Sequence, residues 1–595
     1  MAERACSPAA WSFALAEALW ARFSPLTPYG KDAKERREVL SDREALELIY
    51  DRVEDLSALL AGAPPVLADR VAWHLKRLPR LPFSRRELEA ASAGGPAELE
   101  LELELIELFQ VKKFLANYRG LVQLLDPGLR GRFRLGFESQ ALAASLDRGG
   151  SDPETFFVAD CYHPGLPALR AAIADKDAAI RRARAAAKAR ARLERGLDFG
   201  ERDFLLVPKE EAAALLESGA APSFSVEAYD GRSCAVRIQD DPSTLGLEEE
   251  RAALGARERE LESEVVAALS REVSAEAARL LDYADAICDF DLARARAVLA
   301  SELDAVRPRL GSAALVLEGG RFTPCEEACA KLGLAYTPLD ARIEEGTAVL
   351  FGSNMGGKTV ALQSLLFFQA MAQAGLFVPA ARFETRVYAR LDYVGELRSA
   401  TKAGAAGPRA SARAGSMTID VSTDAGYGAE DADSQGGLSG FGFEIRSFAE
   451  AWEAAGERGS FVVLDEFART TSSAEAEAIL SAAVEAMVGS SGSRWLLATH
   501  FRGIARVPGA RYLDMRGLDR EAAGRAMLSG EPVSERIRRI NRMMRYEIVE
   551  ADEGSGSSDA IAIASLLGLD PRMAERAAGL YAARLAPGAA RGKDT

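Results

Sequence analysis

Cysteine and histidine are scarce in this 595-residue chain, which has six of the former and three of the latter. A protein of this size does not need disulfides to hold its core, so reduced thiols are expected. Cys325 and Cys329 form a CxxxC that could seat part of a metal site, but no second pair accompanies it. Ordinary cysteines on a helix face are therefore the favoured interpretation, with a metal site as the alternative.

Long apolar runs without charge are also missing. The apolar segment near the N-terminus, SPAAWSFALAEALWARFSP, is interrupted by Glu17 and Arg22 and lacks a basic leader. The stretch between charges is too short to span a bilayer. We therefore expect no secretion signal, no membrane contact and a cytoplasmic location.

The chain has no excess of positive charge, because its formal net charge is −15. The whole molecule repels a polyanion at long range, so any contact with nucleic acid has to use local basic patches. Each basic run is either such a patch or a solvated helix face. There are three runs: Lys76, Arg77, Arg80, Arg85 and Arg86; Arg181, Arg182, Arg184, Lys188, Arg190, Arg192 and Arg195; and Arg536, Arg538, Arg539, Arg542 and Arg545.

The length and the 48% apolar content predict three or more structural units. Residues 37–125 carry apolar side chains at three- and four-residue spacing, which is typical of helices. The segment AELELELELIEL at 97–108 alternates like a strand, but Leu and Glu are strong helix formers, so we predict a helix there too. Residues 126–165 contain GRFRLGFESQ and TFFVADCYHPGL, which hint at β structure without assigning it.

Two long helices are predicted to flank a small β-rich tip. Residues 166–196 are rich in Ala and Arg with almost no helix breaker, and 247–285 return to a helical pattern. Between them, 203–239 hold short β-like runs separated by Gly and Pro. Residues 397–437 are too poor in large apolar residues to bury a core and predict a long loop, while 521–595 are expected to be mostly helical.

A phosphate-binding loop is the first motif that carries chemistry. Gly352, Gly357, Lys358 and Thr359 fit G-x-x-x-x-G-K-[ST], with the strand-like AVLF before them and a helical segment after them. Backbone N–H groups and the helix N-terminus would hold phosphates, Lys358 would neutralise the β and γ oxygens, and Thr359 would bind Mg²⁺. Without further motifs, a chance glycine turn is the alternative.

Two further segments support a nucleotide site. SFVVLDEF at 460–467 reads as a buried strand that delivers two acids to a sheet edge. Asp465 would hold the Mg²⁺ water shell, and Glu466 would orient or deprotonate the attacking water. RWLLATH ends in His500, which would sense the γ-phosphate, with a structural histidine as an equal alternative.

These residues resemble the ATPase of the MutS family, the ABC-type relatives that repair or resolve DNA. The first motif resembles the family's phosphate loop, whose Asn-Met-Gly-Gly core adds Ser353, Asn354, Met355 and Gly356 to the nucleotide-binding residues. Five segments resemble family motifs in the same order: GSNMGGKT, GLFVPAARFETRVYARLDYVGE, the signature GLSGFGFEI, LDEFARTTSSAE and LLATHF.

The resemblance implies ATP and Mg²⁺ as cofactors and a homodimer of two ATPase domains. In this family the signature serine, here Ser439, reaches the partner's γ-phosphate, so we expect it to act in trans. The aromatic residue that stacks on adenine maps to Tyr336, for which a core tyrosine is the alternative. Residues 166–285 resemble the family's lever and clamp, and 559–582 resemble its C-terminal dimerising helices.

The implied fold is an α/β P-loop ATPase domain of ABC type, preceded by a mostly α-helical core and lever with a small β-rich clamp tip. A C-terminal helical dimerisation segment completes it. We expect a helical core at 1–165, lever helices at 166–310 with the clamp at 200–245, the ATPase domain at 311–520 and the dimerisation region at 521–595.

Departures from the family pattern bear on the function. No Phe-x-Glu mismatch-reading element occurs near the N-terminus, so the mismatch and connector domains are expected to be absent. The D-loop acid is Glu475, the following residue is Ala476, and the signature threonine is replaced by Gly440. These changes could slow or retune hydrolysis.

Three functions follow from these observations. The first is an ATPase that clamps mismatched or branched double-stranded DNA through its lever tips. The second is a MutS-like ATPase that acts on a protein, as a reactivating or chaperone-like factor for a cobalamin-dependent aminomutase. The third is a nucleotide-binding structural dimer with little turnover.

Overall fold

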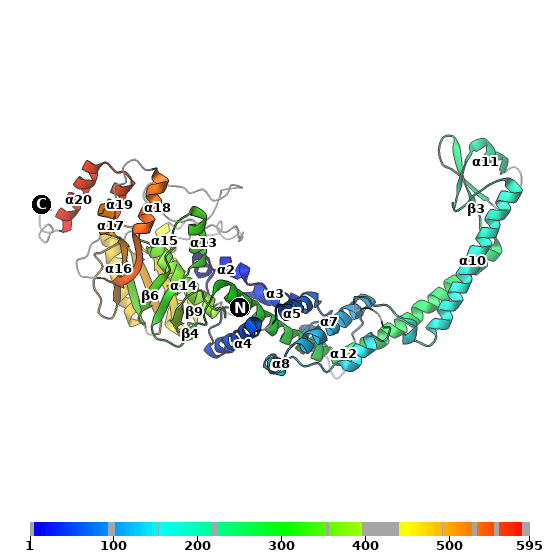
Figure 1. Ribbon diagram of the computed structural model, residues 1–595, viewed down its shortest axis with the longest axis horizontal. Coiled ribbons are helices and arrows are strands. Elements are labelled where there is room, and N and C mark those ends of the chain that lie inside the picture. The colour runs from blue at the N-terminus through cyan, green and yellow to red at the C-terminus, as the bar shows by residue number, and fades with distance from the viewer. Residues whose placement is uncertain are drawn as a thin grey trace. The chain divides into compact units, whose positions relative to one another are not determined.

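The computed structural model describes residues 5–62, 64–92, 101–150, 152, 154–215, 224–352, 356–395, 440–490, 492–525, 532–551 and 559–585. The chain divides into two compact units (Figure 1). Unit 1 comprises residues 1–26, 30–68 and 288–595, and unit 2 comprises residues 27–29 and 69–287. Part of the segment that the sequence suggested as one helical domain, 1–165, thus groups with the phosphate loop.

Unit 1 is built on a six-stranded sheet. Its strands are β7 (Thr347–Phe351), β9 (Arg390–Val394), β10 (Ser460–Asp465), β11 (Arg494–Thr499), β12 (Arg511–Leu518) and β13 (Met544–Glu550). Their order is β13-β12-β7-β11-β10-β9, and all neighbours are parallel except β12 and β13. β7 and β11 are buried along their whole length, as expected for parallel strands with both faces covered.

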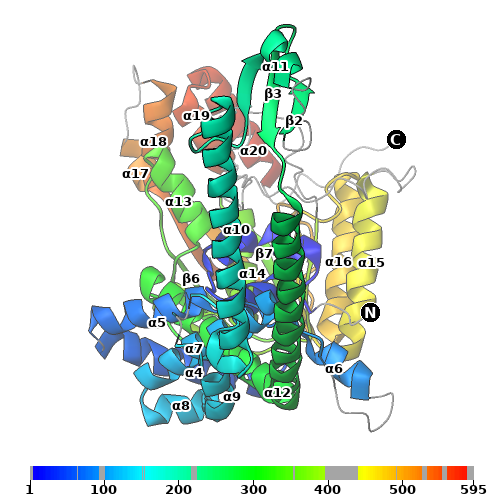
Figure 2. The same cartoon turned by 90° about the vertical axis from the view of Figure 1, so that its right-hand side faces the viewer.

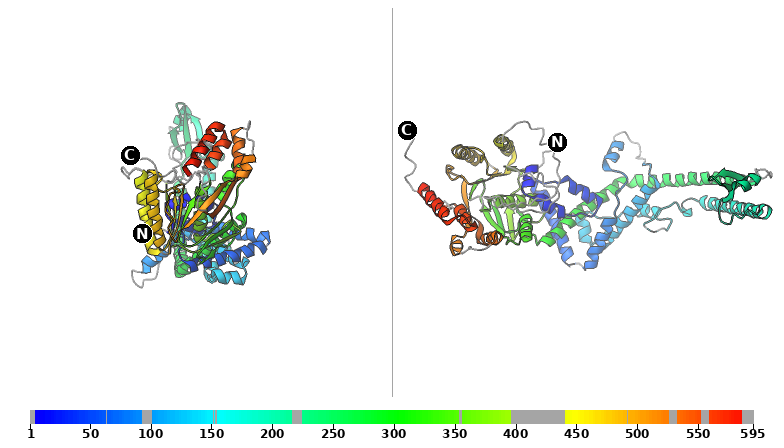
Figure 3. Two further views of the ribbon diagram at one scale, coloured as in Figure 1. Left: turned by 90° about the vertical axis from the view of Figure 1, so that its left-hand side faces the viewer. Right: turned by 90° about the horizontal axis from the view of Figure 1, so that it is seen from above.

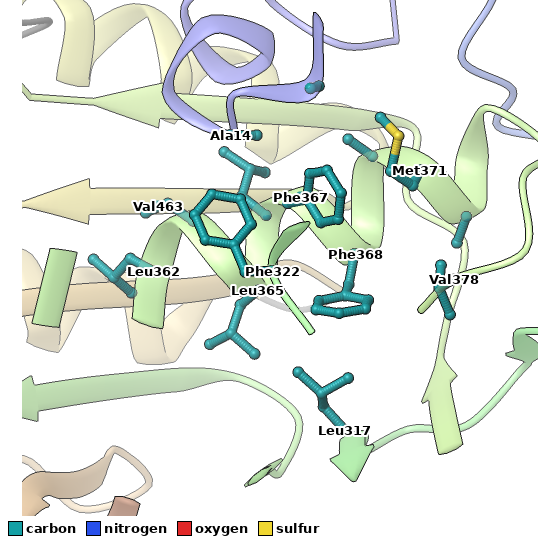
Figure 4. Packing of buried hydrophobic residues seen from close by; sticks show 14 of the residues in the cluster. Ala14, Leu317, Phe322, Leu362, Leu365, Phe367, Phe368, Met371, Val378 and Val463 are labelled. Carbon is teal, nitrogen blue, oxygen red and sulfur yellow. The ribbon is translucent and has the colours of Figure 1, made fainter. Parts of the chain in front are cut away.

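Helices cover the two faces of this sheet. α14 (Lys358–Gln373) covers one face, where Phe367 lies in the main hydrophobic core (Figure 4). α15 (Gly440–Arg458) and α16 (Ser473–Gly489) cover the other face, as Figure 3 shows in yellow, and the fully buried Trp495 lies in that second core. Because alternate strand residues point to opposite faces, one set of short apolar strands supplies both cores.

A second sheet and the N-terminal helices complete this part of unit 1. The second sheet has the order β4-β8-β5-β6, and the ring of Phe13 stacks on Tyr393 at 3.9 Å between centroids. Its strands are β4 (Arg309–Leu310), β5 (Leu315–Gly320), β6 (Leu339–Ile343) and β8 (Arg382–Thr385). The helices are α1 (Pro8–Phe13), α2 (Ala16–Arg22), α3 (Pro28–Arg36), α4 (Arg43–Gly62) and α13 (Thr323–Leu332).

In its described residues, the C-terminal segment combines helices with one strand. The helices are α17 (Arg520–Arg525), α18 (Val533–Met543), α19 (Asp559–Leu567) and α20 (Pro571–Leu585). The segment was predicted to be mostly helical, and β13 is the exception. Its sequence, MRYEIVE, alternates apolar and charged residues over most of its length, which suits an edge strand with one solvated face.

Unit 2 contains the two predicted long helices and the β-rich tip. α10 (Leu166–Arg195) and α12 (Pro242–Leu303) lie side by side and carry the tip at their end (Figure 2); from Cys288 onward α12 belongs to unit 1. The tip sheet has the order β1-β3-β2 and its own small core. Its elements are β1 (Leu205–Pro208), α11 (Lys209–Leu215), β2 (Phe224–Ala228) and β3 (Ser233–Ile238).

The prediction of a helix over 97–108 is wrong for residues 101–104, while 97–100 lie outside the described residues. The backbone N–H groups of Leu101 and Leu103 donate to the hydroxyls of Ser274 and Ser270 on α12, at 2.9 and 3.3 Å. These contacts hold the segment in a non-helical form, so the helix begins only at residue 105.

Residues 126–165 contain short helices and no strand in the part of that segment the structure describes. Of the aromatic residues in the two runs that hinted at β structure, Phe133 is buried and Phe157 is 55% exposed, and neither run takes part in strand pairing. The helices of this region and the rest of unit 2 are α5 (Pro65–Arg77), α6 (Arg85–Ser92), α7 (Leu105–Leu124), α8 (Pro127–Phe133), α9 (Gln140–Leu146) and a 3₁₀ turn (Asp160–Tyr162).

Candidate functional site

The phosphate loop connects β7 to α14 in the centre of the larger sheet. β7 ends at Phe351, and Gly357 is the residue before the first turn of α14. Gly357 has φ +85°, and a Cβ atom at this position would lie 2.8 Å from Cδ1 of Tyr546 on β13. Only glycine fits this left-handed, closely packed position. The predicted loop residues Ser353, Asn354 and Met355 lie outside the described residues.

Lys358 is the first residue of α14 and is only 3% exposed. Its Nζ donates a hydrogen bond to the carbonyl oxygen of Gly352 at 2.8 Å, which folds the side chain back over the loop. Burial lowers the pKa of Lys358, and the charges of Glu466 and Asp465 oppose that shift. A buried ammonium beside carboxylates, at a helix N-terminus, is well placed for polyphosphate.

The two predicted acids lie at the carboxyl end of β10. Asp465 is the last residue of β10 and pairs with Ala498 of β11. The N–H group of Glu466 donates to the carbonyl oxygen of Ala498 at 3.0 Å, and Glu466 has φ +51°. A left-handed conformation in a non-glycine residue is a strained arrangement that often marks functional sites. Arg469 lies 3.4 Å from the Glu466 carboxylate.

His500 directly follows β11 and faces Glu466. Its Nδ1 lies 3.8 Å from Oε1 of Glu466, so the parallel pairing of β10 and β11 brings these two predicted residues together. Burial lowers the pKa of His500 despite the opposing charge of Glu466. The imidazole is therefore neutral at pH 7.

Glu444 is a site residue to which the sequence assigned no role. It lies on α15, is 6% exposed, and accepts a hydrogen bond from the N–H group of Ala468 at 3.0 Å. Ala468 also has positive φ, +62°, two residues after Glu466. Glu444 thus stabilises the turn that follows Glu466. A charged residue between apolar ones in GFGFEI was the signal that could have indicated it.

Glu475, the altered D-loop acid, lies in the first turn of α16. Its carboxylate accepts hydrogen bonds from the hydroxyls of Thr471 at 2.9 Å and Ser472 at 2.7 Å, and Ser472 is the N-cap residue. These contacts lower the pKa of Glu475. The spacing Ser-x-x-Glu before an apolar run is a capping-box signature, so this residue has a structural role in the helix start.

A pocket extends from the N-terminus of α14. Tyr336 lines it, and its hydroxyl accepts from the N–H of Phe322 at 2.7 Å and donates to the carbonyl of Gly320 at 3.3 Å. The hydroxyl is thus tied to the protein while the side chain remains part of the pocket wall. Cys325 and Cys329, the CxxxC of the sequence, also line it. Further lining residues, which the sequence did not indicate, are Asn541, Met544 and Tyr546.

The residues present fit Mg²⁺-ATP. The glycine cradle admits no side chain, Lys358 supplies a buried cation, and the hydroxyl of Thr359 and the carboxylate of Asp465 are hard oxygen donors of the kind Mg²⁺ prefers. Gly356, which precedes Gly357 in the phosphate loop, is among the described residues. Ser439, the signature serine, lies outside the described residues.

The second basic run lies on α10 and is largely paired within unit 2. Arg184 bonds to Asp240 at 2.7 Å and to Glu248 of α12. Lys188 donates to two backbone carbonyl oxygens at the start of the tip, at 3.4 and 2.8 Å. Two further pairs are Arg190 with Asp241 and Arg192 with Asp198. A phosphate would have to compete with these carboxylates.

Two basic runs elsewhere are also paired in part. Arg77 bonds to Glu154 at 2.6 Å, and Arg85 bonds to Asp282 and Asp285 at 2.9 and 2.7 Å. In the third run the pairs are Arg538 with Glu535 and Arg545 with Asp519.

Within the described ranges, none of the helices has the length and apolar character needed to cross a membrane.

Comparison with known proteins finds similarity to MutS proteins. Residues 404–580 match the family model of MutS domain V. The chain is 29% identical over 256 residues to the DNA mismatch repair protein MutS of Natronomonas pharaonis and 30% identical over 270 residues to that of Haloquadratum walsbyi. It is 27% identical over 476 residues to that of Rhodopseudomonas palustris.

These matches cover 42%, 45% and 78% of the chain, in the same order. They cover 26%, 25% and 48% of the relatives' own lengths. The chain therefore spans between a quarter and a half of each of these relatives.

Replacing Gly357 by alanine tests the phosphate loop. We expect Gly357→Ala to lower the free energy of unfolding by about 1–3 kcal/mol, because it forces positive φ on a residue with a Cβ and a clash with Tyr546. ATP binding should weaken by about tenfold or more, as measured by calorimetry. Gly489→Ala is the matched control, since nothing lies within 4 Å of a Cβ at Gly489. Equal effects of the two substitutions would contradict the assignment.

Replacing Glu444 tests its hold on the Glu466 turn. Glu444→Ala removes the acceptor for the Ala468 N–H, which should cost about 1–3 kcal/mol of stability in denaturant unfolding. Glu444→Gln keeps an acceptor oxygen and should unfold close to the wild type. If glutamine destabilises the protein as much as alanine does, the hydrogen bond is not what Glu444 contributes.

Proposed function

The chain belongs to the MutS family, and from this we propose that it binds Mg²⁺-ATP at the phosphate loop and hydrolyses it to ADP and phosphate. Proteins of this family are ATPases. The observation that carries the proposal is the meeting of a buried lysine, two carboxylates and a histidine at one sheet edge, beside a pocket that Tyr336 lines.

In this proposal each residue has one task. The N–H groups at the start of α14 and the ammonium of Lys358 bind the β and γ phosphate oxygens. Glu466 orients the attacking water and accepts its proton, and His500 donates a hydrogen bond to the γ-phosphate. Thr359 and Asp465 would hold Mg²⁺, which neutralises charge on the phosphates when bound.

The adenine ring would pack against Tyr336. Ser439, contributed by the partner subunit, would complete the site in a homodimer. ATP binding would then favour one arrangement of the two subunits, and α12, which carries residues of both units of one chain, would transmit the change to the tip.

The first candidate client is DNA, mismatched or branched, bound without sequence preference by the lever tips. The named relatives are DNA mismatch repair proteins, and the three basic runs supply cations. Backbone contacts of this kind are salt-sensitive. The ion pairs of Arg184 and Arg190 would have to open for these side chains to reach phosphates.

A protein is the second candidate client, and the charge of the tip favours it. Between residues 197 and 241 the chain has ten acidic and four basic residues, so the tip repels a polyanion. Leu206 and Tyr229 are exposed on it, at 50% and 60%. A basic protein surface would suit this tip better than DNA, in line with a reactivating factor for an enzyme such as a cobalamin-dependent aminomutase.

Steady-state ATP hydrolysis tests the activity and separates the clients. We expect Glu466→Gln to lower kcat by about a hundredfold or more while ATP still binds. The wild type is assayed at physiological salt without DNA and with perfect duplex, mismatched duplex and four-way junction. A rate that rises with the junction supports a DNA clamp. A rate that none of the DNA substrates changes, and that Glu466→Gln abolishes, supports a protein as the client. An inactive wild type would contradict the proposed ATPase activity.

The protonation of His500 predicts a pH dependence. Because the pKa of His500 is lowered from its ordinary value of about 6.5, the neutral form persists above that pH. We expect kcat/KM for ATP, which reports the free enzyme, to be level from pH 8 to 6.5 and to fall only below that. The fall should disappear in His500→Gln. An acid limb centred above pH 7 would show that another group controls the rate.

A further inference from the structure

Three residues form a row at the carboxyl edge of the central strands. Thr499 of β11 pairs with Phe351 of β7, and Phe351 pairs on its other side with Asp514 of β12. Phe351 is the last residue before the phosphate loop begins at Gly352. The loop that follows β11, which starts with His500, therefore lies on one side of the phosphate loop and β12 on the other.

Arg502 spans this row. Its Nη1 donates to Oδ2 of Asp514 at 2.8 Å and its Nη2 donates to Oδ1 at 2.7 Å. Its guanidinium carbon lies 5.1 Å from the centre of the Phe351 ring. Two parallel hydrogen bonds fix both the distance and the orientation of the pair, and the ring face adds a further attraction for the cation.

A second tie holds the same loop to β12. The ring of Tyr512 stacks on Phe351 with 6.1 Å between centroids. Its hydroxyl accepts from the N–H of Val507 at 2.8 Å and donates to the carbonyl oxygen of Ala505 at 3.0 Å. Tyr512 thus anchors the far end of the loop. Nearer His500, the N–H group of Gly503 donates to the carboxylate of Glu477 on α16 at 2.9 Å, and Arg502 is the side chain of the loop that is bound to β12.

We propose that Arg502, held by Asp514, is a positioning residue that keeps His500 in place beside Glu466 and the phosphate loop. The inference rests on the proposed ATPase function. It assigns to this ion pair a role in the rate of hydrolysis and not in nucleotide affinity.

A double-mutant cycle on ATP hydrolysis tests this role. Arg502→Gln and Asp514→Asn should each lower kcat by about tenfold, because a displaced catalytic group costs rate, while KM for ATP changes by less than about twofold. The double variant should be no slower than either single one, because both substitutions remove the same contact. Arg502→Lys, which keeps the charge but not the bidentate geometry, should fall between the wild type and Arg502→Gln.

Arg506→Gln is the matched control. Arg506 lies in the same loop with its guanidinium 4.4 Å from the Tyr512 ring centre, and its loss should leave kcat unchanged. All rates are measured well below the unfolding temperature of each variant. An active wild type with an unchanged kcat in Arg502→Gln overturns this inference alone, as does an equal fall in Arg506→Gln. An inactive wild type overturns the proposed function and this inference together.

Discussion

The parallel pairing of β7, β10, β11 and β12 is the constraint on which the rest of the site depends. Residues that are far apart in the chain meet because the carboxyl ends of these strands end at one edge in a fixed register. Asp465 lies beside Ala498, and Thr499 and Asp514 both lie beside Phe351. A shift of one residue in any pair would turn the inward side chains to the other face, so the two buried cores hold this register.

Hydrogen bonds and ion pairs then fix the loops at this sheet edge so that their side chains form one site. Glu444 supports the turn after Glu466 from α15, and Arg502 ties the His500 loop to β12. From near the end of the chain, Tyr546 of β13 packs against Gly357, so the C-terminal segment forms part of the wall of the nucleotide pocket. Several helices and strands of unit 1 therefore form the site, and each of these contacts fixes the position of one part of it.

The local motifs were predictable because each depends on neighbours in sequence. Short patterns predicted the strand before Gly352 and the helix after Gly357, the position of the acids at the end of β10 and of the histidine after β11, and the two helices and the tip of unit 2. Contacts across the fold were not predictable. The basic run on α10 was read as either a nucleic-acid patch or a solvated helix face, yet Arg184 is paired with Glu248, which lies far from it in the sequence.

Two further differences have the same cause. Residues 101–104 alternate like a strand and are held in a non-helical form by hydroxyls of α12, which local helix propensity does not reveal. The pairing of Arg502 with Asp514 requires the register of β11, β7 and β12, and not only the motif around His500. Whether the signature serine acts in trans stays a prediction.

Equilibrium binding of ATP in the presence of Mg²⁺ tests the central claim most directly. Glu466→Gln, which slows turnover, should bind about one ATP per chain, and adding Lys358→Met should weaken that binding by about a hundredfold or more, because it removes the buried cation at the phosphates. Equal affinity with and without Lys358 would contradict the account, since the nucleotide would then be bound somewhere other than this sheet edge.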